Sequence, residues 1–198
     1  MVDVAIDAGA DFIGFVFVPS SPRFIEIEAA RGLIKQVQVA GRKAVGLWQG
    51  RLSSLDLESI IGVGVDIIQA HSPHPGLEND PVVPAWYAFG IGSAADLPRV
   101  CQPYARLLLD AKPPKDAAYA GGHGAQFDWT LLKSWQAPQP WMLAGGLTPD
   151  NVAEAIAISG ASGVDVSSGV ERAKGEKDAE LIRAFVKNAK ANSKLTAK

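Results

Sequence analysis

The chain has 198 residues, with 19 basic and 21 acidic side chains and a net charge of −2. With no block of like charge, it carries no basic patch that would indicate nucleic acid or an anionic membrane surface as a partner. Its apolar runs fall short of the roughly 20 residues that a transmembrane helix needs, and its start lacks the pattern of a signal peptide. The single cysteine, Cys101, permits no internal disulfide and fits a reducing cytoplasm. We therefore expect a soluble protein with one domain over residues 1–198.

Short apolar runs alternate with segments whose apolar residues recur at helical spacing. The expected strands span residues 12–17, 43–48, 65–69, 86–90, 105–110, 141–144 and 163–166. The expected helices lie within residues 1–10, 27–37, 55–61, 94–100, 128–135, 149–160 and 179–189, followed by a frayed tail at 191–198. Gly9 and Gly160 are placed to end helices, and Asp128 and Thr148 to begin them. Strand–helix alternation of this kind predicts a parallel sheet.

The alternation favours a TIM-type (β/α)₈ barrel over an open doubly wound sheet, because a phosphate site after the last two strands is a recurrent barrel feature. No G-x-G-x-x-G motif follows an early strand. Only seven strand–helix units are visible, and no strand precedes the helix that ends near Gly9. We therefore expect a barrel without its first strand. Its open edges, at residues 12–17 and 163–166, would be covered by rearrangement, a partner chain or displaced N-terminal residues.

Two of the predicted strands end abruptly in small residues. Gly145 and Gly146 follow one of them, and Ser167, Ser168 and Gly169 follow the next. Glycines allow close backbone approach, and free N–H groups near a helix start suit an anion. We expect these two turns to bind a phosphate; plain turns between strand and helix are the alternative.

Other candidate residues also follow predicted strands. Asp110 ends an apolar strand where barrel catalysis occurs, so it is a candidate general acid; a surface aspartate that starts a turn is the alternative. His71 also ends a strand, as a substrate contact or a buried structural histidine. Gly121, Gly122 and Gly124 suit a lid or a flexible surface loop. Asp165 is expected to be a hydrogen-bonded core carboxylate, and Cys101 precedes its strand, on the face opposite the expected active site.

An ordered set of motifs over nearly the whole chain resembles the phosphoribosylanthranilate isomerase family of tryptophan biosynthesis. The motifs are Ala8-Gly-Ala-Asp-Phe-Ile-Gly-Phe-Val-Phe-Val-Pro-Ser-Ser-Pro-Arg23, Leu107-Leu-Leu-Asp-Ala111, Gly121-Gly-His-Gly124 with Phe127-Asp-Trp129, Leu143-Ala-Gly-Gly-Leu147 with Pro149-Asp-Asn151, and Val164-Asp-Val-Ser-Ser-Gly-Val-Glu171. The resemblance implies an Amadori rearrangement of N-(5′-phosphoribosyl)anthranilate without cofactor or metal.

The resemblance also implies roles for particular residues. The general acid falls on Asp110, and Arg23 becomes the ligand of the substrate's anthranilate carboxylate, since a guanidinium can hold a carboxylate with two hydrogen bonds. The family's general base, a cysteine in a Lys-x-Cys-Gly motif on the first strand, has no counterpart here. We therefore expect impaired turnover from these 198 residues.

Two other functions remain open from the sequence. One is a different phosphate-binding barrel enzyme, such as a neighbouring tryptophan-pathway synthase or a sugar-phosphate epimerase. The other is a non-catalytic phosphosugar-binding protein. The fold alone does not separate these, because barrels support many chemistries. A monomer and a homodimer are both compatible with the sequence.

Overall fold

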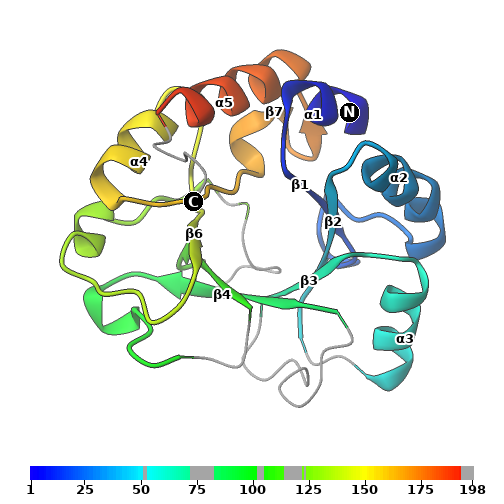
Figure 1. The fold of residues 1–198 in the computed structure, drawn as a ribbon, viewed down its shortest axis with the longest axis horizontal. Coiled ribbons are helices and arrows are strands. Elements are labelled where there is room, and N and C mark those ends of the chain that lie inside the picture. Colours follow the sequence, from blue (N-terminus) through cyan, green and yellow to red (C-terminus); the bar gives the residue numbers. More distant parts are fainter. Residues whose placement is uncertain (51–52, 72–82, 102–104, 114–121, 123, 193–198) are drawn as a thin grey trace.

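A six-stranded parallel sheet forms the centre of the computed structural model. The structure describes residues 1–50, 53–71, 83–101, 105–113, 122 and 124–192. The strands of the sheet are neighbours in chain order: β1 (Phe12–Val16), β2 (Lys43–Trp48), β3 (Ile67–Ala70), β4 (Ala85–Ile91), β5 (Arg106–Ala111) and β6 (Trp141–Leu143). The sheet curls into an incomplete ring with the helices outside it (Figure 1). A doubly wound sheet would reverse its strand order, so the barrel prediction is confirmed.

The remaining elements surround this sheet. The helices are α1 (Val2–Ala8), α2 (Ile27–Val39), α3 (Ser54–Gly62), α4 (Val152–Ser159) and α5 (Ala179–Asn192). The 3₁₀ turns are η1 (Ala94–Asp96), η2 (Trp129–Leu132) and η3 (Ser168–Val170), and an antiparallel hairpin joins β7 (Glu171–Ala173) to β8 (Glu176–Lys177). Gly9 and Gly160 end α1 and α4 in the left-handed conformation, as predicted, which a residue without Cβ adopts easily.

Side chains alternate between the inside and the outside of the curled sheet, as the two-residue period of a strand requires. On β5, Leu108 packs inside the ring with Val45 and Met142, whereas Leu109 packs outside against the helices. Asp110 has the same parity as Leu108, so its carboxyl group faces the interior at the carboxyl end of the strand. This alternation is what brings a carboxyl group into the mouth of the barrel.

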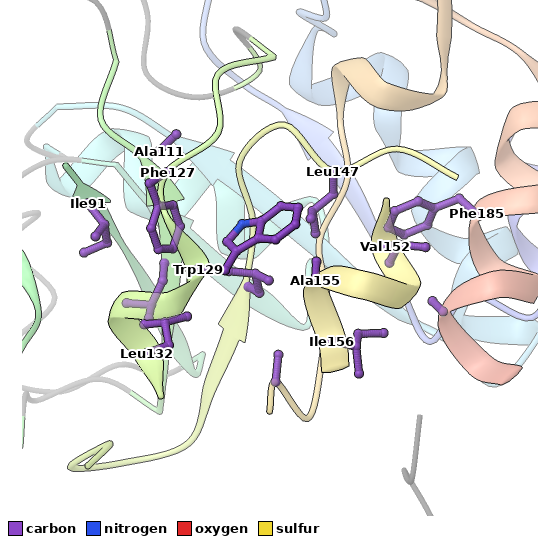
Figure 2. Packing of buried hydrophobic residues seen from close by; sticks show 14 of the residues in the cluster. Ile91, Ala111, Phe127, Trp129, Leu132, Leu147, Val152, Ala155, Ile156 and Phe185 are labelled. Atoms are coloured by element: carbon purple, nitrogen blue, oxygen red, sulfur yellow. The ribbon is translucent and has the colours of Figure 1, made fainter. Parts of the chain in front are cut away.

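An apolar cluster between the sheet and the helices α4 and α5, the outer core, holds the loops around the end of β6. Figure 2 shows Phe127 and Trp129 in one apolar cluster with Val152 and Ala155 of α4 and Phe185 of α5. Burial of a large apolar side chain contributes about 1.5–3 kcal/mol, so such a cluster fixes the path of the chain firmly. The turn between β6 and α4 is therefore anchored on its outer side.

The ring of strands has a gap between β1 and residues 163–166. Among the described residues, β1 pairs in the sheet only with β2, and the later segment pairs with the sheet only at the bridge between Leu143 and Val164. Outside the gap α1 packs beside α5, with Val4, Ala5 and Ala8 against the outer core (Figure 1). The helical layer thus continues where the strand layer is open, and no described strand covers the two edges.

Some predicted elements are shorter than expected. The predicted strand at 163–166 is wrong: it is reduced to the single bridge, because β6 already ends at Leu143. The helices expected within 94–100 and 128–135 are the short turns η1 and η2, although Asp128 does cap η2 by accepting a hydrogen bond from the N–H of Thr130.

Two helix ends also differ from the prediction. Thr148 does not cap α4: Asn151 is the N-cap residue, and its side-chain oxygen accepts a hydrogen bond from the N–H of Thr148. Helix α5 runs to Asn192, past the expected start of the tail, and residues 193–198 lie outside the described part. In that part no helix is long and apolar enough to span a membrane.

Candidate active site

Asp110 lies at the carboxyl end of β5, where its carboxyl group is largely shielded from water. Its pKa is raised from 3.8 to about 7. Burial is the main cause and the nearby carboxylate of Asp165 adds to it, while a 2.7 Å hydrogen bond from the N–H of Ala111 opposes the rise. Near neutral pH this carboxyl group is partly protonated. It can therefore donate a proton and take it back.

The turn after β6 touches this carboxyl group directly. Gly145 has a φ of +87°, and a Cβ atom there would lie 2.5 Å from the backbone nitrogen of Ala111 and 2.9 Å from Oδ1 of Asp110. Gly146, with a φ of +62°, would clash with the carbonyl of Ala125 at 2.7 Å. Any side chain at these positions would displace the turn or the acid, so both glycines are required by space as well as by backbone conformation.

The second predicted turn packs against the first. A Cβ atom on Gly169 would lie 1.8 Å from the carbonyl oxygen of Leu147, so the two backbones are in direct contact there. Ser168 and Gly169 begin η3, and N–H groups in the first turn of a helix have no intrahelical acceptor. Free N–H groups are thus available beside the glycine turn.

The structure brings most of the predicted site residues to one cavity. Its lining includes Asp110, Gly122, Gly145, Gly146, Ser167, Ser168 and Gly169, together with Gly124, Ala125 and Asp165. Gly121 and His123 of the same predicted loop lie outside the described residues. Phosphate binding by this lining stays a prediction.

Arg23 lies next to this cavity rather than in its lining. Its guanidinium group pairs with both carboxylate oxygens of Glu171, at 2.6 and 2.8 Å, and donates to the carbonyl of Gly122 at 3.3 Å. Both charged side chains are almost fully buried, with 9% and 4% of their surfaces exposed. Arg23 is therefore held at the rim through Gly122, and its role as a carboxylate ligand stays a prediction.

Glu171 and Lys177 belong to the site although sequence reasoning gave them no role. Burial alone would raise the pKa of Glu171, but hydrogen bonds from Arg23, Lys177 and the N–H of Gly175 lower it to about 2. Burial lowers the pKa of Lys177, and Glu171 opposes that change. Glu171 and Lys177 lie on either side of Gly175, a turn glycine with a φ of +84°. Two opposite charges around a glycine turn are the sequence signal that could have placed these two side chains next to each other.

His71 and Asp165 also face the barrel interior. His71 lies outside the cavity lining, its ring Nε2 is 2.8 Å from Nε2 of Gln69, and burial lowers its pKa to about 4. Asp165 was expected to be a hydrogen-bonded core carboxylate. Instead it lines the cavity beside Asp110, burial raises its pKa, and within the described part of the chain no hydrogen bond stabilises its charge. Cys101 is exposed.

Comparisons of the sequence with known proteins identify one family. The family model "N-(5'phosphoribosyl)anthranilate (PRA) isomerase" matches residues 1–188. An N-(5'-phosphoribosyl)anthranilate isomerase from Hyphomonas neptunium is 46% identical over 97% of this chain and 92% of its own, and one from Acidiphilium cryptum is 45% identical over 94% and 91%.

Solved structures of this family have the same fold. The phosphoribosyl anthranilate isomerase of Thermotoga maritima has a TM-score of 0.79 and 31% identity, over 95% of this chain and 92% of that one. Another, in complex with reduced 1-(o-carboxyphenylamino)-1-deoxyribulose 5-phosphate, has a TM-score of 0.77 and 30% identity, over 95% and 91%. The match of sequence and fold leaves one conclusion: the chain belongs to the N-(5'-phosphoribosyl)anthranilate isomerase family.

Proposed function

We propose that this site binds N-(5′-phosphoribosyl)anthranilate and catalyses its Amadori rearrangement to 1-(2-carboxyphenylamino)-1-deoxyribulose 5-phosphate, in tryptophan biosynthesis. The observation that carries the proposal is the buried carboxyl group of Asp110, which burial gives a raised pKa of about 7, in one cavity with the turns at Gly145–Gly146 and Ser167–Gly169. A general acid works best when its pKa lies near the operating pH. A phosphosugar substrate needs an anion site within reach of such an acid, and this cavity offers both.

In the proposed reaction, protonated Asp110 donates its proton to the furanose ring oxygen as the bond from C1′ to that oxygen breaks. The lone pair of the aniline nitrogen forms a double bond to C1′ in the same step. Removal of the C2′ proton by a base then gives an enamine, which tautomerises to the ketone product. Asp110 recovers its proton before the next turnover.

The substrate's two anionic ends are assigned to two parts of the site. The turns at Gly145–Gly146 and Ser167–Gly169 bind the phosphate through backbone N–H groups. Arg23, at the rim through Gly122, binds the anthranilate carboxylate, and His71, the residue after β3, is a further substrate contact. We place the enzyme in the cytoplasm, as a monomer or a homodimer, without a metal or an organic cofactor.

Calorimetric binding of the reduced product analogue tests the site separately from turnover. We expect tight binding by the unaltered chain, similar binding by Asp110→Asn, and binding at least about tenfold weaker for Arg23→Met, because loss of a charge-assisted hydrogen bond is worth about 1.5–3 kcal/mol. Conversion is measured after one upstream strand with the Lys-x-Cys-Gly motif has been added to both proteins, and that of Asp110→Asn should then fall below that of the otherwise unaltered chain. Equal conversion by the two proteins would rule out Asp110 as the acid.

A further inference from the structure

Lys177 contacts both halves of the proposed site. Its Nζ donates to the carbonyl of Ser167 at 2.7 Å and to Oε1 of Glu171 at 2.9 Å. The lysine belongs to β8, and 29% of its side chain is exposed. A lysine rarely gives up this much hydration unless its charge is matched by partners of this kind. One of its hydrogen bonds reaches the turn proposed to bind phosphate, and the other reaches Glu171, which holds the guanidinium group of Arg23.

The first hydrogen bond controls the phosphate turn. No cis peptide bond occurs in the described chain, and in a trans peptide the C=O and N–H groups point in opposite directions. Because Lys177 holds the carbonyl of Ser167, the N–H of Ser168 in the same peptide plane points away from the lysine. Ser168 lines the cavity and begins η3, so this N–H has no intrahelical acceptor. The lysine therefore orients a donor that is free to bind an anion.

The second hydrogen bond leads to Arg23. Glu171 accepts from Lys177 through one carboxylate oxygen and from Arg23 through both. The N–H of Gly175 adds a third donor at 3.1 Å, and a Cβ atom on Gly175 would lie 2.7 Å from the carbonyl oxygen of Pro22. The hairpin of β7 and β8 is thus seated on the loop that carries Arg23. Glu171 fixes the plane of the guanidinium group.

We propose that Lys177 is a positioning residue that fixes the phosphate-binding turn relative to the guanidinium group of Arg23. The inference rests on the proposed function and adds to it a residue that never touches the substrate. A ligand with phosphate at one end and carboxylate at the other is held in one orientation only when the phosphate-binding turn and the guanidinium group of Arg23 keep fixed positions relative to each other. Without the ammonium group, the Ser167 carbonyl loses the donor from Lys177, and Oε1 of Glu171 is left with Arg23 as its donor. The turn is then no longer tied to Glu171 and is free to rotate.

The test uses two ligands and three variants. Ribose 5-phosphate carries only the phosphate, and the reduced product analogue carries both anionic ends. We expect Lys177→Met to weaken both ligands at least about tenfold, about 1.4 kcal/mol at 25 °C. Lys177→Arg, which keeps the charge and the donors, should restore most of this loss. Lys174→Met, which changes an exposed lysine in the same hairpin, should stay within about twofold of the unaltered chain.

The expected pattern separates positioning from loss of stability. Arg23→Met should weaken the analogue but leave ribose 5-phosphate binding within about twofold, whereas Lys177→Met weakens both. The amide NMR signal of Ser168 should respond to ribose 5-phosphate in the unaltered chain and in Lys177→Arg, and lose that response in Lys177→Met.

A folded Lys177→Met chain that binds both ligands as the unaltered chain does would overturn the positioning role and leave the proposed function intact. Failure of the unaltered chain to bind the analogue would instead overturn the proposed function. If Lys177→Met does not fold, Lys177→Ala, which leaves the Glu171–Arg23 pair intact and room for water, takes its place. Weak ribose 5-phosphate binding by that variant supports the role, and unchanged binding overturns it.

Discussion

Replacement of Asp110 by asparagine should stabilise the folded protein at alkaline pH. A carboxyl group whose pKa is raised by folding keeps its proton in the folded state over a pH range in which the unfolded chain has lost it. The folded state then binds more protons, so the free energy of unfolding falls as the pH rises through that range. For Asp110 the range runs from about pH 4 to about pH 7, because its pKa rises from 3.8 to about 7.

The size of the effect follows from that change in pKa. Each pKa unit corresponds to about 1.4 kcal/mol, so an ionised Asp110 costs the fold as much as about 4 kcal/mol above pH 7. Asparagine removes this cost, and its side-chain oxygen still accepts the hydrogen bond from the N–H of Ala111. Because part of the group is solvated, we expect a gain of about 2–4 kcal/mol at pH 8 and less than about 1 kcal/mol at pH 4.

Urea unfolding of the two proteins from about pH 4 to pH 8.5 measures this difference. Asp150→Asn, at an exposed position before α4, controls for the loss of one negative charge. A gain for Asp110→Asn that is the same at pH 4 and pH 8, or no larger than that of the control, would refute the burial argument. The buried acid would then no longer explain the proposed catalysis.

Three further predictions concern the turns, the buried charges and turnover. Gly169→Ala should lower the free energy of unfolding by more than about 2 kcal/mol, because its Cβ atom would overlap the carbonyl oxygen of Leu147. The control is Gly32→Ala, in helix α2 with open space around it, which should be neutral or stabilising in the same urea assay. Glu171→Gln should cost on the order of 3 kcal/mol in urea unfolding, since it leaves two buried cations short of an anion, and a loss below about 0.5 kcal/mol would contradict this. Residues 1–198 alone should show little isomerase turnover, because they lack the Lys-x-Cys-Gly motif that the family resemblance implies for the base. One added upstream strand with that motif should restore turnover. Robust turnover without the addition would be evidence against this prediction.

Local patterns predicted those parts of the fold that local forces determine. The strand expected at 43–48 is β2 without change, because its apolar run is buried on both faces. Gly9 and Gly160 end their helices for a reason visible in the sequence, namely the left-handed conformation that glycine tolerates. The strand expected at 163–166 depends on neighbours instead. β6 stops before the glycine turn and no strand among the described residues lies on the other side, so one bridge is all that forms.

The candidate site divides in the same way. Asp110 was predictable, because an apolar run that ends in a carboxylate marks the mouth of a barrel. The buried ion pair was not, because Arg23 and Glu171 are 148 residues apart in sequence and nothing local indicates that either is buried. Lys177 was missed for a related reason. The hairpin that carries it is polar and short, with too little apolar alternation to predict a strand.

The gap in the strand ring divides the proposed site into two groups of residues. Asp110 and the two turns proposed to bind phosphate lie on β5, after β6 and in the segments that follow, on one side of the gap. Arg23 follows β1, on the other side, and the Glu171–Arg23 pair joins the two sides at the mouth. Lys190 of α5, which contacts Asp11 at 3.7 Å, joins them at the opposite end. Because charged contacts and helix packing hold the two sides together, we expect the groups proposed to bind substrate to keep their relative positions with no described strand between them. The base that the family resemblance places on such a strand is absent from residues 1–198.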